Sequence, residues 1–73
     1  MTGTEALADA VRRLTAAGIE GAARDARRLL AHALGIAPDR VTLVAPEEMS
    51  HEAVARFGAA VAARVARQPV AQI

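Results

Sequence analysis

A chain of 73 residues supports one small domain, and its 20 alanines indicate that close contacts between helices build much of the core. The chain has nine arginines, no lysine and eight acidic residues, and its net charge of +1 is far below that of a dedicated nucleic-acid binder. The chain has no cysteine, which excludes disulfides and thiolate metal sites and favours a cytoplasmic protein. It has no apolar run near the ~20 residues of a membrane span, which favours a soluble protein with no membrane partner.

The first predicted helix runs from about Glu5 to Ala17. Thr2 or Thr4 can cap its N-terminus, and Glu5 is placed to close a capping box with Thr2. Gly18 then ends the helix. One apolar stripe recurs at helical spacing and is expected to face the core: Leu7, Val11 and Leu14.

A second helix is predicted from near Gly21 to Leu34, with Gly35 as a left-handed cap at its C-terminus. Its apolar stripe consists of Ala22, Ala26, Leu29, Leu30, Ala33 and Leu34. Pro38 suits the first turn of a shorter third helix, which must end before Pro46. The apolar residues of that helix are Val41, Leu43 and Val44.

Ser50 is a suitable N-cap for a last helix from His51 to about Arg67, which Pro69 ends. Its apolar residues repeat at intervals of three and four: Val54, Phe57, Val61 and Val65. With short connections and no alternating strand pattern, the chain is predicted to be all-α, a compact bundle of four to five short helices. The apolar end at 69–73 looks cut from something longer.

No set of residues in the sequence indicates catalysis or metal binding. The glycines form neither a dinucleotide-binding nor a P-loop pattern. His32 and His51 lie on different predicted helices without a cysteine or a spaced carboxylate, so each is interpreted as an ordinary surface histidine. Glu47 and Glu48 precede a helix cap and are expected to face water, while capping explains Ser50. We therefore predict no catalytic, cofactor or metal site.

The arginines differ in whether a carboxylate lies three or four residues away on the same helix. The pairs expected from this spacing are Asp9 with Arg12 or Arg13, Glu20 with Arg24, Asp25 with Arg28, and Glu52 with Arg56. Arg27, Arg40, Arg64 and Arg67 have no such neighbour, which favours them for contact with another molecule. The macrodipole at the end of the last helix is an alternative explanation for Arg64 and Arg67.

Three segments carry a resemblance to a known family. Residues 25–35 read DARRLLAHALG and resemble the DAxxLLxHxLG signature of the N-terminal domain of the release factor glutamine methyltransferases, the PrmC or HemK family. Residues 14–19, LTAAGI, resemble its LxxAGI helix end, and Phe57, Arg64 and 69–70 follow the order of its last helix. The resemblance covers essentially all 73 residues. Arg67 stands where the family often has glycine, and Gln72 where it often has a larger residue.

The resemblance implies an enzyme that transfers a methyl group from S-adenosylmethionine to the glutamine of the GGQ motif in class I peptide-chain release factors. In that family a Rossmann-like domain carries the chemistry, with a glycine-rich loop and an Asn-Pro-Pro-Tyr tetrapeptide. This chain contains no Asn and no Tyr. The resemblance thus implies that residues 1–73 form a single helical N-terminal domain of a longer two-domain methyltransferase. It binds no cofactor itself, and S-adenosylmethionine belongs to the other domain.

The resemblance also implies that the helical domain grips the release factor and orients it toward a distant pocket. Its expected partners are class I release factors and the methyltransferase domain of the same chain. As a hypothesis, Arg27, Arg64 and Arg67 contribute to the release-factor or interdomain surface, because they lack local carboxylate partners.

Two other readings come from different functional classes. One is a nucleic-acid-binding module that uses Arg24, Arg27 and Arg28, which Asp25 and Glu20 oppose by their negative charge. The other is a free-standing helical adaptor with no enzyme attached, which a helical bundle alone does not exclude.

Overall fold

The computed structural model describes residues 1–66 and confirms the predicted all-α bundle. The predicted end of the last helix at Arg67 and the apolar end at 69–73 lie outside the described residues. The elements, in chain order, are α1 (Gly3–Ala16), α2 (Ala22–Leu34), the 3-10 turn η1 (Pro38–Arg40), α3 (Val41–Val44) and α4 (His51–Val65). In this part of the chain, no helix is long and apolar enough to cross a membrane.

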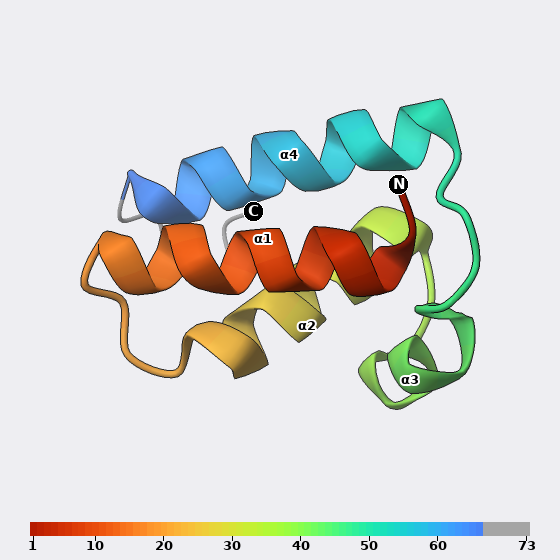
Figure 1. Cartoon of the computed structure of the whole chain (residues 1–73), viewed down its shortest axis with the longest axis horizontal. Coiled ribbons are helices and arrows are strands. Elements are labelled where there is room, and N and C mark those ends of the chain that lie inside the picture. Colours follow the sequence, from red (N-terminus) through yellow and green to blue (C-terminus); the bar gives the residue numbers. More distant parts are fainter. Residues whose placement is uncertain (67–73) are drawn as a thin grey trace.

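Three longer helices surround one core (Figure 1). Helices α1 and α4 run in the same direction, and α2 runs back in the opposite direction against both. The short helix α3 lies at the end of the bundle where α1 and α4 begin. From α3 the chain rises past the N-terminus to the start of α4, so the segment around residues 45–49 lies beside residues 1–4.

The predicted helix caps are confirmed, and because Thr2 rather than Thr4 caps α1, this helix begins at Gly3 instead of near Glu5. The Thr2 hydroxyl accepts a hydrogen bond from the Glu5 N–H, and the Glu5 carboxylate accepts one from the Thr2 N–H, which completes the capping box of α1. The Ser50 hydroxyl caps α4 by accepting from the Ala53 N–H at 3.1 Å. Gly35 ends α2 with φ +70°, in the left-handed region that favours glycine.

The buried face of α1 differs from the predicted stripe. Leu14 is fully buried, but Leu7 and Val11 only pack against the edge of the core, and Ala6 and Ala10 lie deepest instead. Small side chains allow the backbones of neighbouring helices to approach closely, so the alanines of α1 take the central positions. The larger residues on either side then seal the edge of the interface.

The predicted apolar face of the third helix is also only partly correct. Val41 is buried, whereas the Leu43 side chain is 70% exposed. Since α3 contains four residues, it completes about one turn and can direct only one side of that turn inward. Of its three apolar side chains, the one at Val41 joins the hydrophobic core.

Residues 1–4 and 45–49 form what we call the N-terminal strap, which includes an antiparallel bridge between Thr2 and Glu48. Its backbone hydrogen bonds run from the N–H of Gly3 to the carbonyl of Glu47 (3.2 Å), from Thr4 to Ala45 (2.8 Å) and from Met49 to Met1 (3.0 Å). A Cβ atom built on Gly3 would lie 2.9 Å from the Cα of Ala45, closer than real side chains come. Glycine at position 3 therefore permits the strap to close.

Candidate partner-binding surfaces

Arg64 has a carboxylate partner on another helix, although the sequence offered none nearby on its own helix. Its Nε donates to Oδ2 of Asp25 at 3.0 Å, across 39 residues of chain. The two side chains are 23% and 11% exposed, so this ion pair lies largely inside the protein between α4 and α2. Arg64 thus joins two helices, and whether it also contacts a partner stays a prediction.

The same contact shows that the expected pair between Asp25 and Arg28 is wrong. Asp25 lies in the first turn of α2 and is buried, and its carboxylate points to Arg64 of α4 rather than along its own helix. Within residues 1–66, Arg28 takes part in no ion pair. The predicted pair of Glu20 with Arg24 does not form in this part of the chain.

Arg27 is exposed on the outer side of α2, and its contact with a partner stays a prediction. Arg24 and Arg28 are exposed on the same helix, as is His32. Positions 24, 28 and 32 follow one another at intervals of four residues, so their side chains share one side of the helix, with Arg27 next to them. We call these four residues the α2 basic face. Arg67, the third candidate, lies outside the described residues.

Two of the predicted local ion pairs are confirmed. Arg12 lies 3.2 Å from Asp9, and Arg56 lies 3.9 Å from Glu52, in both cases with exposed side chains. Arg56 also donates from Nε to the carbonyl of Ala33 at 3.0 Å, one of the last carbonyls of α2 that has no partner within its helix. This arginine therefore links α4 to the C-terminal end of α2.

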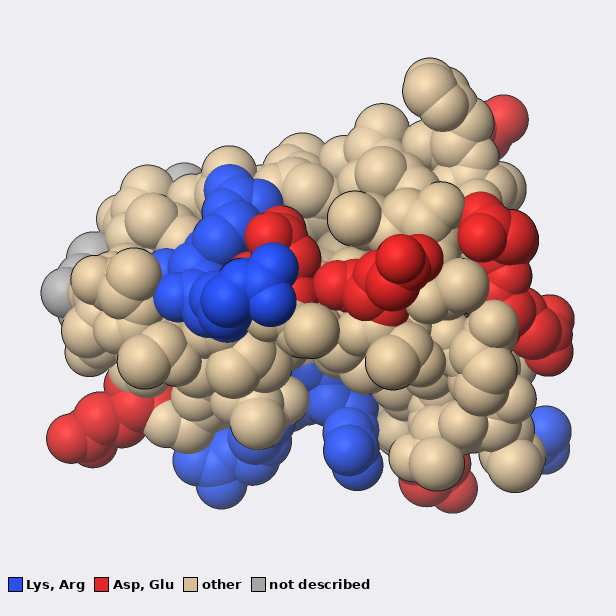
Figure 2. All heavy atoms as spheres, viewed as in Figure 1, with Lys and Arg blue, Asp and Glu red and all other residues tan. Residues whose placement is uncertain are grey.

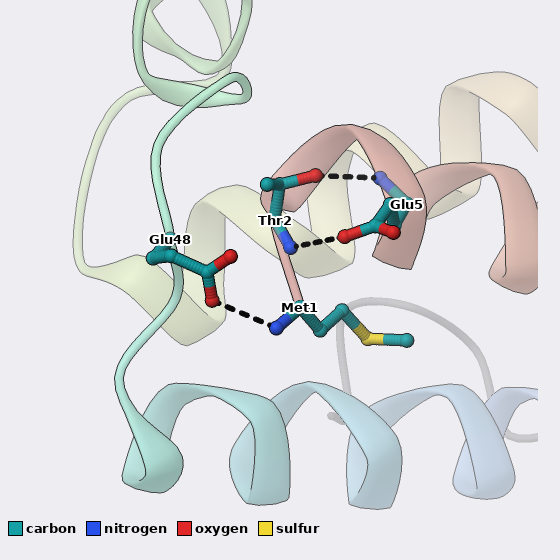
Figure 3. A network of polar contacts seen from close by, with 4 residues as sticks. All are labelled: Met1, Thr2, Glu5 and Glu48. Atoms are coloured by element: carbon teal, nitrogen blue, oxygen red, sulfur yellow. Dashed lines mark hydrogen bonds and ion pairs between the residues drawn. The ribbon is translucent and has the colours of Figure 1, made fainter.

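The amino terminus forms a small polar network at the strap (Figure 3). The Met1 ammonium group donates to Oε2 of Glu48 at 2.8 Å, and this hydrogen bond raises the pKa of the amino group. The backbone hydrogen bond from Thr2 lowers the pKa of Glu5, because it stabilises the ionised carboxylate. Both groups face solvent, so these contacts fix local geometry more than they stabilise the fold.

Basic and acidic side chains lie next to one another on the face seen in Figure 2. Basic side chains gather over the C-terminal half of α1, where Arg12 and Arg13 are exposed. Acidic side chains lie toward the N-terminal end of α1 and the neighbouring edge, where the exposed acids are Glu5, Glu47 and Glu48. A second basic group projects at the lower edge, on the side of α2.

Two shallow apolar grooves interrupt the surface. One, of about 190 Å³, lies between α1 and α4 over Phe57 and Val61, with Asp9 and Arg13 among its lining residues. The other, of about 200 Å³, lies between the end of α2 and the strap and is lined by Ile36 and other apolar side chains. Within residues 1–66, no three His, Asp or Glu side chains gather in an arrangement that could hold a metal ion.

Comparison with known proteins adds an independent finding. A family model described as the PrmC N-terminal domain matches residues 5–73. A release factor glutamine methyltransferase of Cereibacter sphaeroides is 63% identical over all 73 residues, which make up 26% of that protein. One from Rhodospirillum rubrum is 39% identical over 61 residues, which are 84% of this chain and 19% of that protein. The chain thus spans about a quarter or less of these relatives. No solved structure matches.

Proposed function

The chain belongs to the PrmC N-terminal domain family, and from this premise we propose that it is the substrate-recognition domain of a protein-(glutamine-N5) methyltransferase. The enzyme would methylate the glutamine of the GGQ motif in class I peptide-chain release factors, in the cytoplasm. The observation that carries this proposal is the 63% identity, over the whole chain, to a protein named as a release factor glutamine methyltransferase.

We assign recognition rather than chemistry to these 73 residues because of what they contain. The relative from Cereibacter sphaeroides is about four times as long as this chain, which leaves room in it for a methyltransferase domain that binds S-adenosylmethionine. The chain itself has neither Asn nor Tyr, so it lacks the tetrapeptide that the family resemblance assigns to the glutamine pocket. Its contribution to the reaction would be to hold the release factor in a productive orientation.

The three arginines selected from the sequence take different parts in this proposal. Arg27 is exposed on α2 and suits direct contact with the release factor. Arg64 is mostly buried against Asp25, so we propose that it positions the end of α4, which leads toward the methyltransferase domain, instead of contacting the substrate directly. Arg67 stays a candidate for the surface between the two domains.

The test compares methyl transfer to a release factor by the full-length enzyme and by a version lacking residues 1–73. Both proteins are first checked for S-adenosylmethionine binding, so that loss of recognition is separated from loss of the catalytic domain. We expect the shortened enzyme to bind the cofactor normally and to lose most of its kcat/KM for the release factor. Undiminished kcat/KM would show that the bundle is not needed for recognition.

A further inference from the structure

We propose that the α2 basic face, formed by Arg24, Arg27, Arg28 and His32, docks onto a carboxylate-rich surface of the protein substrate. This inference rests on the proposed function and deepens it, because it assigns the contact to one side of one helix and gives the chemistry of the opposing surface. It follows from the positions of the carboxylates, from the charge balance along α2 and from the small extent of the basic face.

The carboxylate that could neutralise this face is turned away from it. Asp25 is the one acidic residue of α2, and its Oδ2 accepts from Arg64 at 3.0 Å on the inner side of the helix. Its side chain is 11% exposed. Among residues 1–66, no ion pair involves Arg24, Arg27 or Arg28, whereas Arg12 and Arg56 each have a carboxylate within 4 Å. The guanidinium groups of α2 are therefore available to carboxylates of another molecule.

Stability of the domain does not explain why these residues are arginines. Arg24 and Arg28 are like charges four residues apart on one helix, and Arg24 and Arg27 are three apart, spacings at which like charges repel. Arg24 also lies in the first turn of α2, where the helix macrodipole disfavours a cation. These arginines repel one another and have no carboxylate partner within residues 1–66, so contact with another molecule explains them better than stability of the domain does.

The dimensions and surroundings of the face favour a protein over a nucleic acid. Three arginines within two helical turns can meet a few carboxylates in bidentate geometry, a match that arginine makes well. A polyanion instead needs a long basic track, and here the exposed arginines outside α2 share the surface with exposed acids such as Glu5, Glu47 and Glu48, within a net charge of +1. An acidic patch on the protein substrate is thus the favoured occupant.

The experiment uses the full-length methyltransferase with a release factor as substrate. The test variant carries Arg24→Glu and Arg28→Glu. The matched control carries Ala8→Glu, Thr15→Glu, Ala55→Glu and Ala62→Glu, exposed positions outside α2 that together make the same change in net charge. A third variant, with Arg24→Lys and Arg28→Lys, keeps the charge. For each protein we would measure the release-factor KM and kcat at two salt concentrations, the affinity for S-adenosylmethionine, and the melting temperature.

We expect the test variant to raise the release-factor KM by about tenfold at low salt, with kcat and cofactor affinity unchanged and an unchanged or higher melting temperature. The control should stay within about twofold of the wild type, and the lysine variant should lie between the two. Higher salt should weaken binding by the wild type and reduce the difference between variants, because it screens exposed charges.

The proposal is overturned if the test variant and the control have the same release-factor KM. If that result occurs while deletion of residues 1–73 abolishes recognition, the proposed function stands and a different surface is responsible. If the deletion also leaves KM unchanged, both proposals fail. A single-stranded RNA oligonucleotide that binds the wild type but not the test variant, with KM for the release factor unaffected, would assign the face to nucleic acid instead.

Discussion

Two ion pairs join distant parts of this chain, and they lie in different surroundings. Asp25 and Arg64 meet at 3.0 Å between α2 and α4, with side chains that are 11% and 23% exposed. The Met1 ammonium group and Glu48 meet at 2.8 Å in the N-terminal strap, with side chains that are 45% and 72% exposed. The two contacts are nearly equal in length, so their distances do not indicate which one matters for stability.

Burial decides how much each ion pair matters for stability, because water screens an exposed pair and solvates either partner when the other is lost. If a largely buried pair loses one member, the remaining charge stays in a poor solvent. The strap, in contrast, is held by backbone hydrogen bonds and by the close approach of Gly3 to Ala45. Removal of one charge is therefore expected to matter most at the α2–α4 contact, and a change of backbone geometry at the strap.

The sharpest test of this comparison is Asp25→Ala, which removes the carboxylate that the largely buried Arg64 guanidinium contacts between α2 and α4. We expect the free energy of unfolding to fall by about 2–4 kcal/mol, toward the lower end because Arg64 keeps some access to water. Urea denaturation of the 73-residue chain measures it. The double variant Asp25→Leu with Arg64→Met should recover much of the loss. Equal losses in the single and double variants would show that the charges are not the cause.

Gly3→Ala should produce the next largest effect. The new Cβ would meet the backbone of Ala45 at 2.9 Å, so the strap must shift, and we expect a loss of about 1–3 kcal/mol in the free energy of unfolding. Gly58→Ala in α4 is the matched control, since a Cβ there has no atom within 4 Å and alanine favours a helix by about 0.5–1 kcal/mol. If both substitutions stabilise the protein, the contact of Gly3 with Ala45 does not constrain the strap.

Removal of a helix cap should lower the free energy of unfolding by less than Gly3→Ala does. Thr2→Ala deletes the hydroxyl that accepts from Glu5 N–H, and we expect a loss of about 1 kcal/mol together with faster hydrogen exchange in the first turn of α1. Ser50→Ala should do the same at the start of α4. Each substitution should affect its own helix only, and a change that spreads to both helices would mean that the caps also support the strap.

The smallest expected effect is that of Glu48→Gln at neutral pH, because the pair with Met1 is exposed. Its signature is a pH dependence. The pKa of the Met1 amino group is raised in the folded chain, so the contribution of the pair is complete below the ordinary pKa of about 8 and is lost as pH rises through the folded value.

The chain contains no lysine, cysteine or tyrosine, so the amino terminus is the group that titrates between about pH 8 and 11. The free energy of unfolding of the wild type should decline slightly over this range, and that of Glu48→Gln should stay level. Denaturation curves at several pH values measure the difference. A decline that persists in the variant would assign the effect to another cause.

The features that the sequence predicted correctly depend on residues close to one another along the chain. Thr2 with Glu5, Ser50 and Gly35 each act within one turn of their helix, and each is confirmed. The same local signals placed the ends of α2 at Gly21 and Gly35. Helix boundaries could be predicted because capping depends on hydrogen bonds across three or four residues.

The features that were missed depend on how the helices pack. A search for carboxylates three or four residues away could not find Asp25 as the partner of Arg64, since the two are 39 residues apart. A signal was present in the family resemblance, which includes Asp25 in the signature at 25–35 and Arg64 in the separate pattern of the last helix. The exposure of Leu43 and the central place of Ala6 likewise follow from tertiary packing, which helical periodicity alone does not specify.

The strap also sets an order of events when the protein is made. A ribosome delivers residues 1–34 first, so α1 and α2 can pack as a nascent hairpin while their later partners are still being synthesised. The strap can close only after Met49 has left the exit tunnel, and the Asp25–Arg64 contact only after the end of α4 has followed. The growing domain is therefore completed in steps, and until the last step the carboxylate of Asp25 has no helix α4 to cover it.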